Sequence, residues 1–466
     1  GVGIKLVGTE LNKRLLYLYE VMDYLEHELE LPHELLATYA DFMDNHRFPL
    51  DVERTFLSTL KLTILRKEKA VGEEGLSWFT SQDKLDLPSI FYDILAYFLG
   101  REISRAEKAF LTFPMQIGLL ASEIGRPDIL AMAKEVLGLT VQEFGISLDI
   151  EESALILQCH LVYMLNRSVM KWQFTEISLR EQLIQSSFSK VVSQFFVERV
   201  MERTGLSISD KEVILLAAWM ELLLARKSKP LIAKVAVITQ SGQSFSYLVD
   251  NQIRQIFNSE VQLDFLDFAN HPPYEELNRT YDLIFTDNLL YSQELFQPFL
   301  SLSLVTKENQ AEREALERTV LGRKIQMHCQ VELARFDEGK SYEDNKQALL
   351  EQLVAKQFIG QEVADKLQEK EAAHPAISEN GYAYPHLTDA SLEQIILVVP
   401  VQDSLHLSSQ TGLAVHDFVL IFVPSELDDF NQDLLFNIFD NTFRMGKRSH
   451  IKERLGIDQR SDMLTL

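Results

Sequence analysis

The spacing of hydrophobic positions along this chain changes near residue 230. Before that point, apolar residues recur every three or four positions over segments of roughly ten residues or more, which is typical of helices that bury one face. After it, short β-rich runs alternate with helical patterns. We expect helices in the first part over Leu11–His27, Pro32–Asp44, Leu50–Leu65, Leu87–Leu99, Ser104–Ile124, Asp128–Leu137, Ile150–Asn166, Leu179–Arg203 and Ser209–Ala225.

Polar residues mark where several of these helices begin. Thr9 precedes the first helix and is a suitable N-cap. Ser104 with Glu107, and Ser209 with Glu212, have the spacing of capping boxes, in which each side chain satisfies a free backbone N–H group of the first turn.

The two helical blocks resemble each other at an offset of about one hundred residues. Phe56–Arg66 aligns without a gap with Leu157–Arg167, and Ile103–Met115 aligns with Ile208–Met220. Two paired segments in the same order predict a duplicated helical bundle.

The part after residue 230 predicts two α/β domains. The first has strands Val235–Thr239, Val261–Phe265 and Leu283–Thr286, with a loop after its first strand that points backbone N–H groups at an anion. A charge-rich helical connector then covers 306–320. The second α/β domain has the elements Ser341–Gln357, Gly360–Glu371, Gln394–Val399, Asp417–Val423 and Leu434–Met445, and we expect His386 on a turn between elements, with its imidazole raised to the surface.

Composition narrows the possible classes of protein. The 466 residues are 46% hydrophobic and carry a net charge of −24, which disfavours nucleic-acid binding by the chain itself, because phosphate contacts need Lys and Arg. No apolar run reaches about 18 residues, the length of a membrane span. Two cysteines, Cys159 and Cys329, provide no disulfide framework and suit a reducing cytoplasm. No metal-ligand spacing or phosphate-binding glycine motif is present, so we expect no metal or cofactor.

His160 is the first candidate for chemistry. It lies on the apolar helix Ile150–Asn166, and Arg167 follows two turns later. Imidazole acts as a nucleophile or as a proton acceptor near neutral pH. The alternative is a buried histidine that donates a hydrogen bond to a carbonyl group, and Arg167 either anchors a phosphoryl group or pairs with a carboxylate.

These motifs together resemble those of bacterial transcriptional regulators controlled by the sugar phosphotransferase system, of the mannitol-operon and lichenan-operon activator type. Mga-type virulence regulators share much of this plan. The resemblance assigns 1–10 to the remnant of a winged-helix wing, with the DNA-binding head upstream, and 11–127 and 128–229 to two phosphotransferase regulation domains. It assigns 230–305 to an enzyme IIB-like domain, 306–320 to a linker and 321–466 to an enzyme IIA-like domain of the fructose/mannitol type.

The regulation domains of this family carry phosphorylatable histidines at two positions each. His160, followed by Leu161 and Arg167, matches the first motif of the second domain, and Trp219 stands where its second histidine is expected. The matching positions of the first domain hold Thr59 and Pro114. The resemblance therefore implies that only His160 remains as an acceptor in this pair of domains.

The two α/β domains differ in how well they keep the family motifs. Thr239 replaces the nucleophilic cysteine of the IIB-like loop, so phosphocysteine chemistry is expected to be absent. Gly381-Tyr-Ala-Tyr-Pro-His386 matches the IIA-like motif and makes His386 the second expected phosphoacceptor, with His374 and His416 as candidate supporting histidines.

The resemblance implies a cytoplasmic homodimer that receives phosphate from HPr or an enzyme IIB component and controls carbohydrate-utilisation genes. The alternative is a Mga-type virulence regulator, controlled by dimerisation or a protein partner. A phosphotransferase enzyme is disfavoured by the missing cysteine, and an RNA-binding antiterminator by residues 231–466, because such relatives end after the second regulation domain.

Overall fold

The computed structural model describes residues 6–22, 30–46, 48, 50–81, 86–117, 126–172, 187–225, 231–239, 243–257, 261–286, 299–301, 310–378, 381–443 and 450–457. The chain forms two compact units. Unit 1 comprises Gly1–Gly138, Asp149–Ile184 and Ser193–Trp219, and unit 2 comprises Leu139–Leu148, Gln185–Val192 and Met220–Leu466. Parts of four predicted segments lie outside the described residues: 1–5 of the wing, 179–186 of a helix, 240–242 of the loop and 306–309 of the connector.

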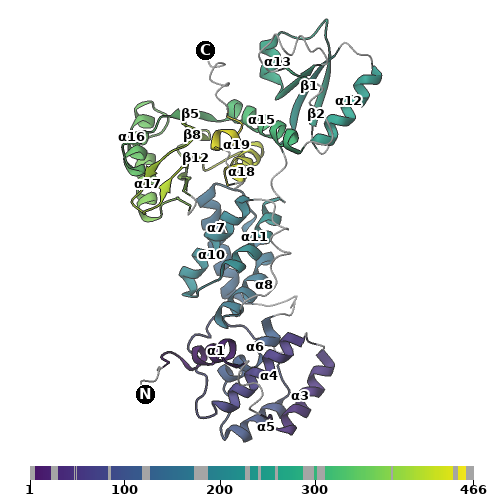
Figure 1. The fold of residues 1–466 in the computed structure, drawn as a ribbon, viewed down its shortest axis with the longest axis vertical. Helices are drawn as coiled ribbons and strands as arrows, with labels where there is room; N and C mark the ends of the chain where they lie inside the picture. The colour runs from purple at the N-terminus through teal and green to yellow at the C-terminus, as the bar shows by residue number, and fades with distance from the viewer. Residues whose placement is uncertain are drawn as a thin grey trace. The chain divides into compact units, whose positions relative to one another are not determined.

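Unit 1 is helical throughout its described secondary structure (Figure 1). Thr9 caps the first helix, because its Oγ1 accepts a hydrogen bond from the Asn12 N–H group at 3.2 Å. The helices that lie wholly or largely in this unit are α1 Glu10–Glu20, α3 His33–His46, α4 Leu50–Leu65, α5 Ser89–Leu99, α6 Arg105–Ile117, α7 Pro127–Phe144, α8 Ile150–Val169, α10 Ser187–Thr204 and α11 Asp210–Ala225.

Helix α6 is the centre of the first helical block. Its residues Phe110 and Phe113 pack with Leu15 of α1, whereas Leu111 packs on another side with Phe56 of α4 and Phe91 of α5. A helix buried on several sides has apolar residues around its circumference, which agrees with the burial of every residue from Ala109 to Ile117.

The first sheet of unit 2 is parallel and has the strand order β2-β1-β3-β4. Helix α15 packs against it through Leu316 and Val320, so part of the predicted connector is a core helix. The elements are β1 Ala233–Thr239, α12 Gln243–Ile256, β2 Val261–Asp267, α13 Tyr274–Thr280, β3 Leu283–Thr286, β4 Phe299–Ser301 and α15 Gln310–His328.

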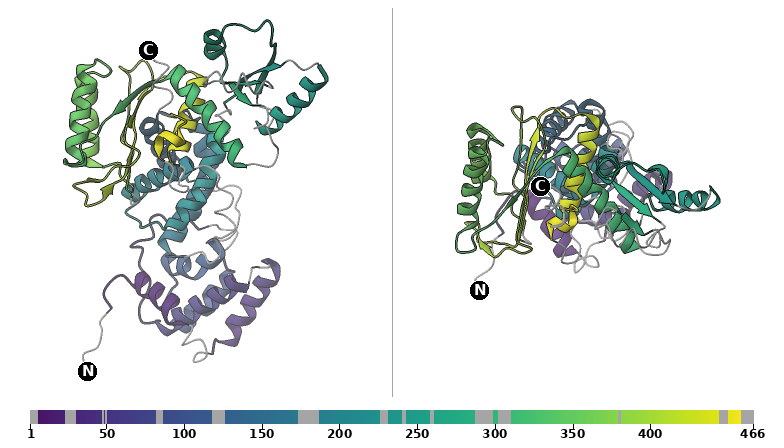
Figure 2. Two further views of the ribbon diagram at one scale, coloured as in Figure 1. Left: turned by 45° about the horizontal axis from the view of Figure 1, so that its top comes forward. Right: turned by 90° about the horizontal axis from the view of Figure 1, so that it is seen from above.

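The second sheet of unit 2 is mixed and has the order β5-β8-β12-β7. Helices α16 and α17 lie on one face of this sheet, and α18 and α19 lie on the other (Figure 2). The elements are β5 Gln330–Ala334, α16 Tyr342–Ala355, α17 Gln361–Ala373, β6 Tyr382–Ala383, β7 His386–Asp389, β8 Ile396–Pro400, β9 Leu407–Ser408, β10 Ala414–Val415, β11 Asp417–Phe418, β12 Leu420–Pro424, α18 Asp429–Phe443 and α19 Ile451–Arg454.

Two expectations about the elements were wrong in ways that matter for function. Helix α7 does not stop at Leu137 but continues through Gly138 to Phe144, because Leu137, Thr140 and Phe144 keep burying one helix face. His386 does not lie on a turn but begins strand β7. The structure confirms the mixed organisation of helical and α/β parts, and Leu50–Leu65 is a helix with the predicted bounds.

No helix in the described part of the chain is both long and apolar enough to cross a membrane.

Candidate functional site

The motif Gly381–His386 is held in place by close backbone packing in unit 2. Gly381 has φ +74°, and a Cβ atom there would lie 2.4 Å from the Ala414 carbonyl oxygen. Ala383 is completely buried, and the Ile421 N–H group donates to the Pro385 carbonyl oxygen at 3.0 Å. The small and rigid residues of the motif therefore fit a narrow path that ends at His386.

The imidazole of His386 is buried among aromatic rings. Phe144 of α7 stacks on it at 5.2 Å between ring centroids, Tyr384 stacks at 6.2 Å, and Phe439 of α18 meets its edge at 5.9 Å. Only 4% of His386 is exposed. The expectation that the turn raises this ring to the surface was wrong, because the extended end of α7 covers it.

Both ring nitrogens of His386 have polar neighbours. Nδ1 lies 3.1 Å from the Tyr384 carbonyl oxygen, which can only accept, so Nδ1 is the donor. Nε2 lies 3.0 Å from Glu143 Oε1, although the angle is not that of a regular hydrogen bond. Lys370 of α17 forms an ion pair with the same Glu143 oxygen at 2.7 Å and donates to the His386 carbonyl oxygen at 2.8 Å.

The charge on Glu143 is stabilised by these neighbours. Burial alone raises the pKa of the Glu143 carboxyl group, but the contacts with His386 and Lys370 outweigh burial and lower the pKa to about 2. Glu143 is therefore ionised at neutral pH and forms the negative centre of a small, partly buried cluster of polar groups.

The two candidate supporting histidines lie elsewhere. His374 ends helix α17 and is exposed. His416 lies against Gly381, with its ring 5.7 Å from that of His406 and Nδ1 3.4 Å from the Leu405 carbonyl oxygen. Within the described residues, the charged side chains beside His386 are instead Glu143 and Lys370.

In unit 1, the structure brings His160 and Trp219 together. Their ring centroids are 6.2 Å apart, His160 is half-buried and Trp219 is 38% exposed. Arg167 makes a bidentate, buried ion pair with Glu212 of α11, at 2.5 Å and 2.7 Å. Of the two interpretations of Arg167, pairing with a carboxylate is the one observed.

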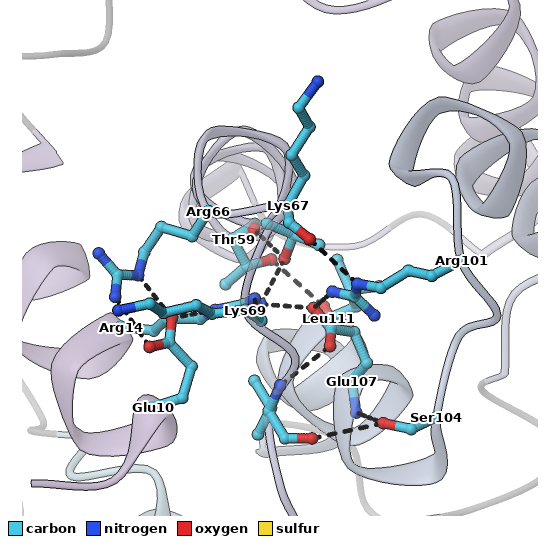
Figure 3. Close-up of polar contacts among 12 residues, drawn as sticks. Glu10, Arg14, Thr59, Arg66, Lys67, Lys69, Arg101, Ser104, Glu107 and Leu111 are labelled. Atoms are coloured by element: carbon cyan, nitrogen blue, oxygen red, sulfur yellow. Dashed lines mark hydrogen bonds and ion pairs between the residues drawn. The ribbon is translucent and has the colours of Figure 1, made fainter.

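In the first block the corresponding positions are Thr59 and Pro114, and Thr59 lies beside a buried network of charges (Figure 3). Thr59 is completely buried and donates to the Phe56 carbonyl oxygen at 2.7 Å, while Pro114 lies inside α6. One turn along α4, Thr63 accepts a hydrogen bond from Arg14, which is itself fully buried. The degenerate positions Thr59 and Pro114 are thus part of a packed core.

The two helical blocks differ in how their ion pairs are arranged. In the alignment, Arg66 and Glu107 of the first block correspond to the Arg and Glu that pair directly in the second. Here, however, Arg66 pairs with Glu10 at 2.5 Å and Glu107 pairs with Arg14 at 2.7 Å. Helix α1 thus supplies one acid and one base that separate the aligned pair, and Figure 3 shows this row of side chains.

The glutamates of both predicted capping boxes point into the bundles. Glu107 N–H donates to Ser104 Oγ at 3.1 Å as expected. Its carboxylate, however, binds Arg14 and the Val71 N–H group, and the Glu212 carboxylate binds Arg167. For the first box, the predicted bond from the Glu107 N–H group to Ser104 is therefore confirmed. In both boxes the glutamate side chain, instead of returning to the N-cap, forms a tertiary ion pair.

Thr239, the last residue of β1, is buried, and its carbonyl oxygen accepts a hydrogen bond from the Phe268 N–H group at 3.3 Å. The loop that follows it lies outside the described residues. Across the described ranges, no group of three or more His, Cys, Asp or Glu side chains is arranged to hold a metal ion.

Sequence reasoning missed Glu143, Lys370, Glu10 and Arg14. The continued apolar spacing at Leu137, Thr140 and Phe144 was a signal that α7 extends further, although nothing local connects it to His386. The chain matches no protein-family model, and a search of curated proteins found no relative.

Proposed function

We propose that this chain is the sensory body of a DNA-binding transcriptional regulator, controlled by histidine phosphorylation and by dimerisation, that acts on carbohydrate-utilisation genes. The observation that carries the proposal is the polar surrounding of His386. Because Nδ1 donates to the Tyr384 carbonyl group, Nε2 is the nitrogen left to react, and the Lys370 ammonium group binds the same carboxylate oxygen as Nε2. An ammonium group at this place suits a transferred phosphoryl group.

The layout of the rest of the chain supports the same proposal. Two helical blocks, each with a buried Arg–Glu ion pair, precede two α/β parts, which is the order that the resemblance implies. We place His160 as a second acceptor beside Trp219. In this proposal the chain receives phosphate from HPr or an enzyme IIB component and does not pass it to a sugar.

Site mapping by mass spectrometry under conditions that preserve phosphohistidine tests this function. The chain is incubated with phosphoenolpyruvate, enzyme I and HPr, with and without an enzyme IIB component, next to His160→Ala and His386→Ala. Phosphate on either histidine that disappears in the matching variant supports the proposal. Phosphate on neither histidine contradicts it.

A second candidate is a Mga-type regulator that a protein partner or dimerisation controls. The observation in its favour is that Thr59 and Pro114 are built into a packed core, while His386 itself is covered. Full regulatory activity of a dimer carrying His160→Ala and His386→Ala would favour this candidate over the first.

A further inference from the structure

Residues Glu143, Phe144 and Gly145, called here the α7 cap, cover His386 within unit 2. Phe144 stacks on the imidazole, and its ring also meets Phe188 at 5.5 Å and Phe439 at 5.9 Å. Gly145 has φ +63°, and a Cβ atom there would lie 2.6 Å from Val423 Cγ1. The cap is therefore fitted closely to the sheet that carries the histidine.

The polar groups beneath the cap have more hydrogen-bonding capacity than Glu143 uses. Thr388 lies two residues after His386 on β7, so both side chains are on the same face of the strand. Thr388 Oγ1 and His386 Nε2 are buried and have no regular hydrogen bond in the structure. A carboxylate offers two oxygen atoms, whereas a phosphoryl group offers three.

The carboxylate of Glu143 also lies directly against Nε2 of His386. With Nδ1–H donated to Tyr384, the neutral ring has its lone pair on Nε2. A carboxylate oxygen 3.0 Å from Nε2 interacts favourably with an N–H group and unfavourably with a lone pair. The closed cap thus places a carboxylate oxygen against Nε2, where an electrophile would have to approach.

We infer that the α7 cap is a removable plug, in which Glu143 occupies the place that a phosphoryl group on His386 Nε2 takes between Lys370 and Thr388. The inference rests on the proposed function for the identity of the incoming group. When the cap leaves, the N–P bond of a donor phosphohistidine breaks and the Nε2–P bond forms; the donor imidazole takes up a proton from solvent, while His386 Nδ1–H stays hydrogen-bonded to the Tyr384 carbonyl group. The new dianion repels the Glu143 carboxylate, so phosphorylation and cap closure oppose each other.

The test measures access to His386 and phosphorylation separately, on the full chain. Diethyl pyrocarbonate modifies accessible neutral imidazoles, and mass spectrometry follows His386 with exposed His374 as an internal reference. The proteins are wild type, Glu143→Gln, Glu143→Ala and a control, Glu135→Gln. The control removes another carboxylate of α7, one that pairs with Arg203 of α10. Thermal melting checks that each variant folds.

We expect His386 to react slowly in the wild type and in Glu135→Gln, and roughly tenfold faster in both Glu143 variants, a ratio equivalent to about 1.4 kcal/mol. Phosphorylation by HPr should rise in parallel. Equal reactivity of His386 and His374 in the wild type, or no increase in the Glu143 variants, would overturn the plug. If His386 were phosphorylated at the same rate in all four proteins, the plug would be contradicted and the proposed function supported. Faster modification without any phosphate would support the plug and contradict phosphorylation.

Discussion

At the scale of single residues, Arg14 stands out because its charged side chain is completely buried. Its guanidinium group binds Glu107, Thr63 and the Lys69 carbonyl oxygen. Arg14→Met would leave the Glu107 charge short of a partner inside the core, so we expect a loss of about 3–5 kcal/mol in the free energy of unfolding. Urea unfolding followed by tryptophan fluorescence measures this, because Trp78 and Trp172 pack against the same core.

The matched control is Arg105→Met, on an exposed position of α6. Its effect should stay within about 0.5 kcal/mol. Equal effects of the two substitutions would show that the buried network does not stabilise the first block.

Glu143 gives unit 2 a defined pH dependence. Its folded-state pKa of about 2, against an ordinary value of 4.5, means that its contribution to stability is complete above about pH 4.5 and is lost as pH falls towards 2. The difference corresponds to roughly 3 kcal/mol. We expect Glu143→Gln to melt below the wild type at pH 6 in calorimetry, with the gap narrowing as the pH approaches 3.

Other carboxylates titrate over the same range but are common to both proteins. Asp389, whose pKa the hydrogen bond from Lys366 lowers to about 2, is one of them. A gap that stays constant from pH 6 to pH 3 would contradict the assignment to Glu143.

What the sequence reveals about the site depends on how local each contact is. The Thr9 cap and the bond from Glu107 N–H to Ser104 link residues three positions apart, and both were predictable. The contact between Glu143 and His386 joins residues far apart in the chain, and no local pattern encodes it. The partner of Arg167 was also left open, because a carboxylate and a phosphoryl group attract a guanidinium group alike.

At the scale of elements, α15 and the segment after α19 cross at two glycines. A Cβ atom on Gly322 would lie 2.1 Å from the Gly456 carbonyl oxygen, and one on Gly456 would lie 2.0 Å from the Arg318 carbonyl oxygen. Alanine normally stabilises a helix interior by about 1 kcal/mol relative to glycine. We expect Gly322→Ala to destabilise instead, visible as faster amide exchange in α19 and in β12, which belongs to the sheet that α19 covers.

Gly360→Ala is the control for this prediction, because a Cβ atom on Gly360 meets no atom within 4 Å. Unchanged exchange in α19 and β12 of Gly322→Ala would mean that the crossing relaxes without cost.

The elements that sequence patterns missed have tertiary causes. The predicted helix ended at Leu137, yet α7 continues past Gly138 because the residues beyond it bury one face. Strand β5, at the edge of its sheet, is mostly half-buried and gave no strong apolar run. Strong periodic segments such as α4 needed no such context and were predicted correctly.

At the scale of the whole molecule, the positions of the tryptophans allow the unfolding of one unit to be followed without the other. All three, Trp78, Trp172 and Trp219, belong to unit 1, and each unit has apolar cores of its own. We expect Arg14→Met to move the fluorescence transition and leave amide exchange in β12 unchanged, and Gly322→Ala to do the reverse. A joint shift of both probes in either variant would contradict separate unfolding.

The change from helical to α/β patterning near residue 230 predicted the broad organisation of the molecule, because hydrophobic period is a property of long segments. The sequence did not predict that Leu139–Leu148 and Gln185–Val192, which come from the helical part, belong to unit 2. Such an exchange depends on packing between distant segments.

The acid and base that α1 contributes to the first bundle have a consequence for how sequences of this kind can change. Glu10 and Arg14 lie one turn apart and enter the core as opposite charges, so together they leave its net charge unaltered. Losing Glu10 alone removes the carboxylate that pairs with Arg66, and losing Arg14 alone leaves Glu107 with the partly exposed Arg101 as its remaining cationic contact. Descendants of this protein should therefore keep or lose the two residues together, and aligned homologues would reveal them as a co-varying pair.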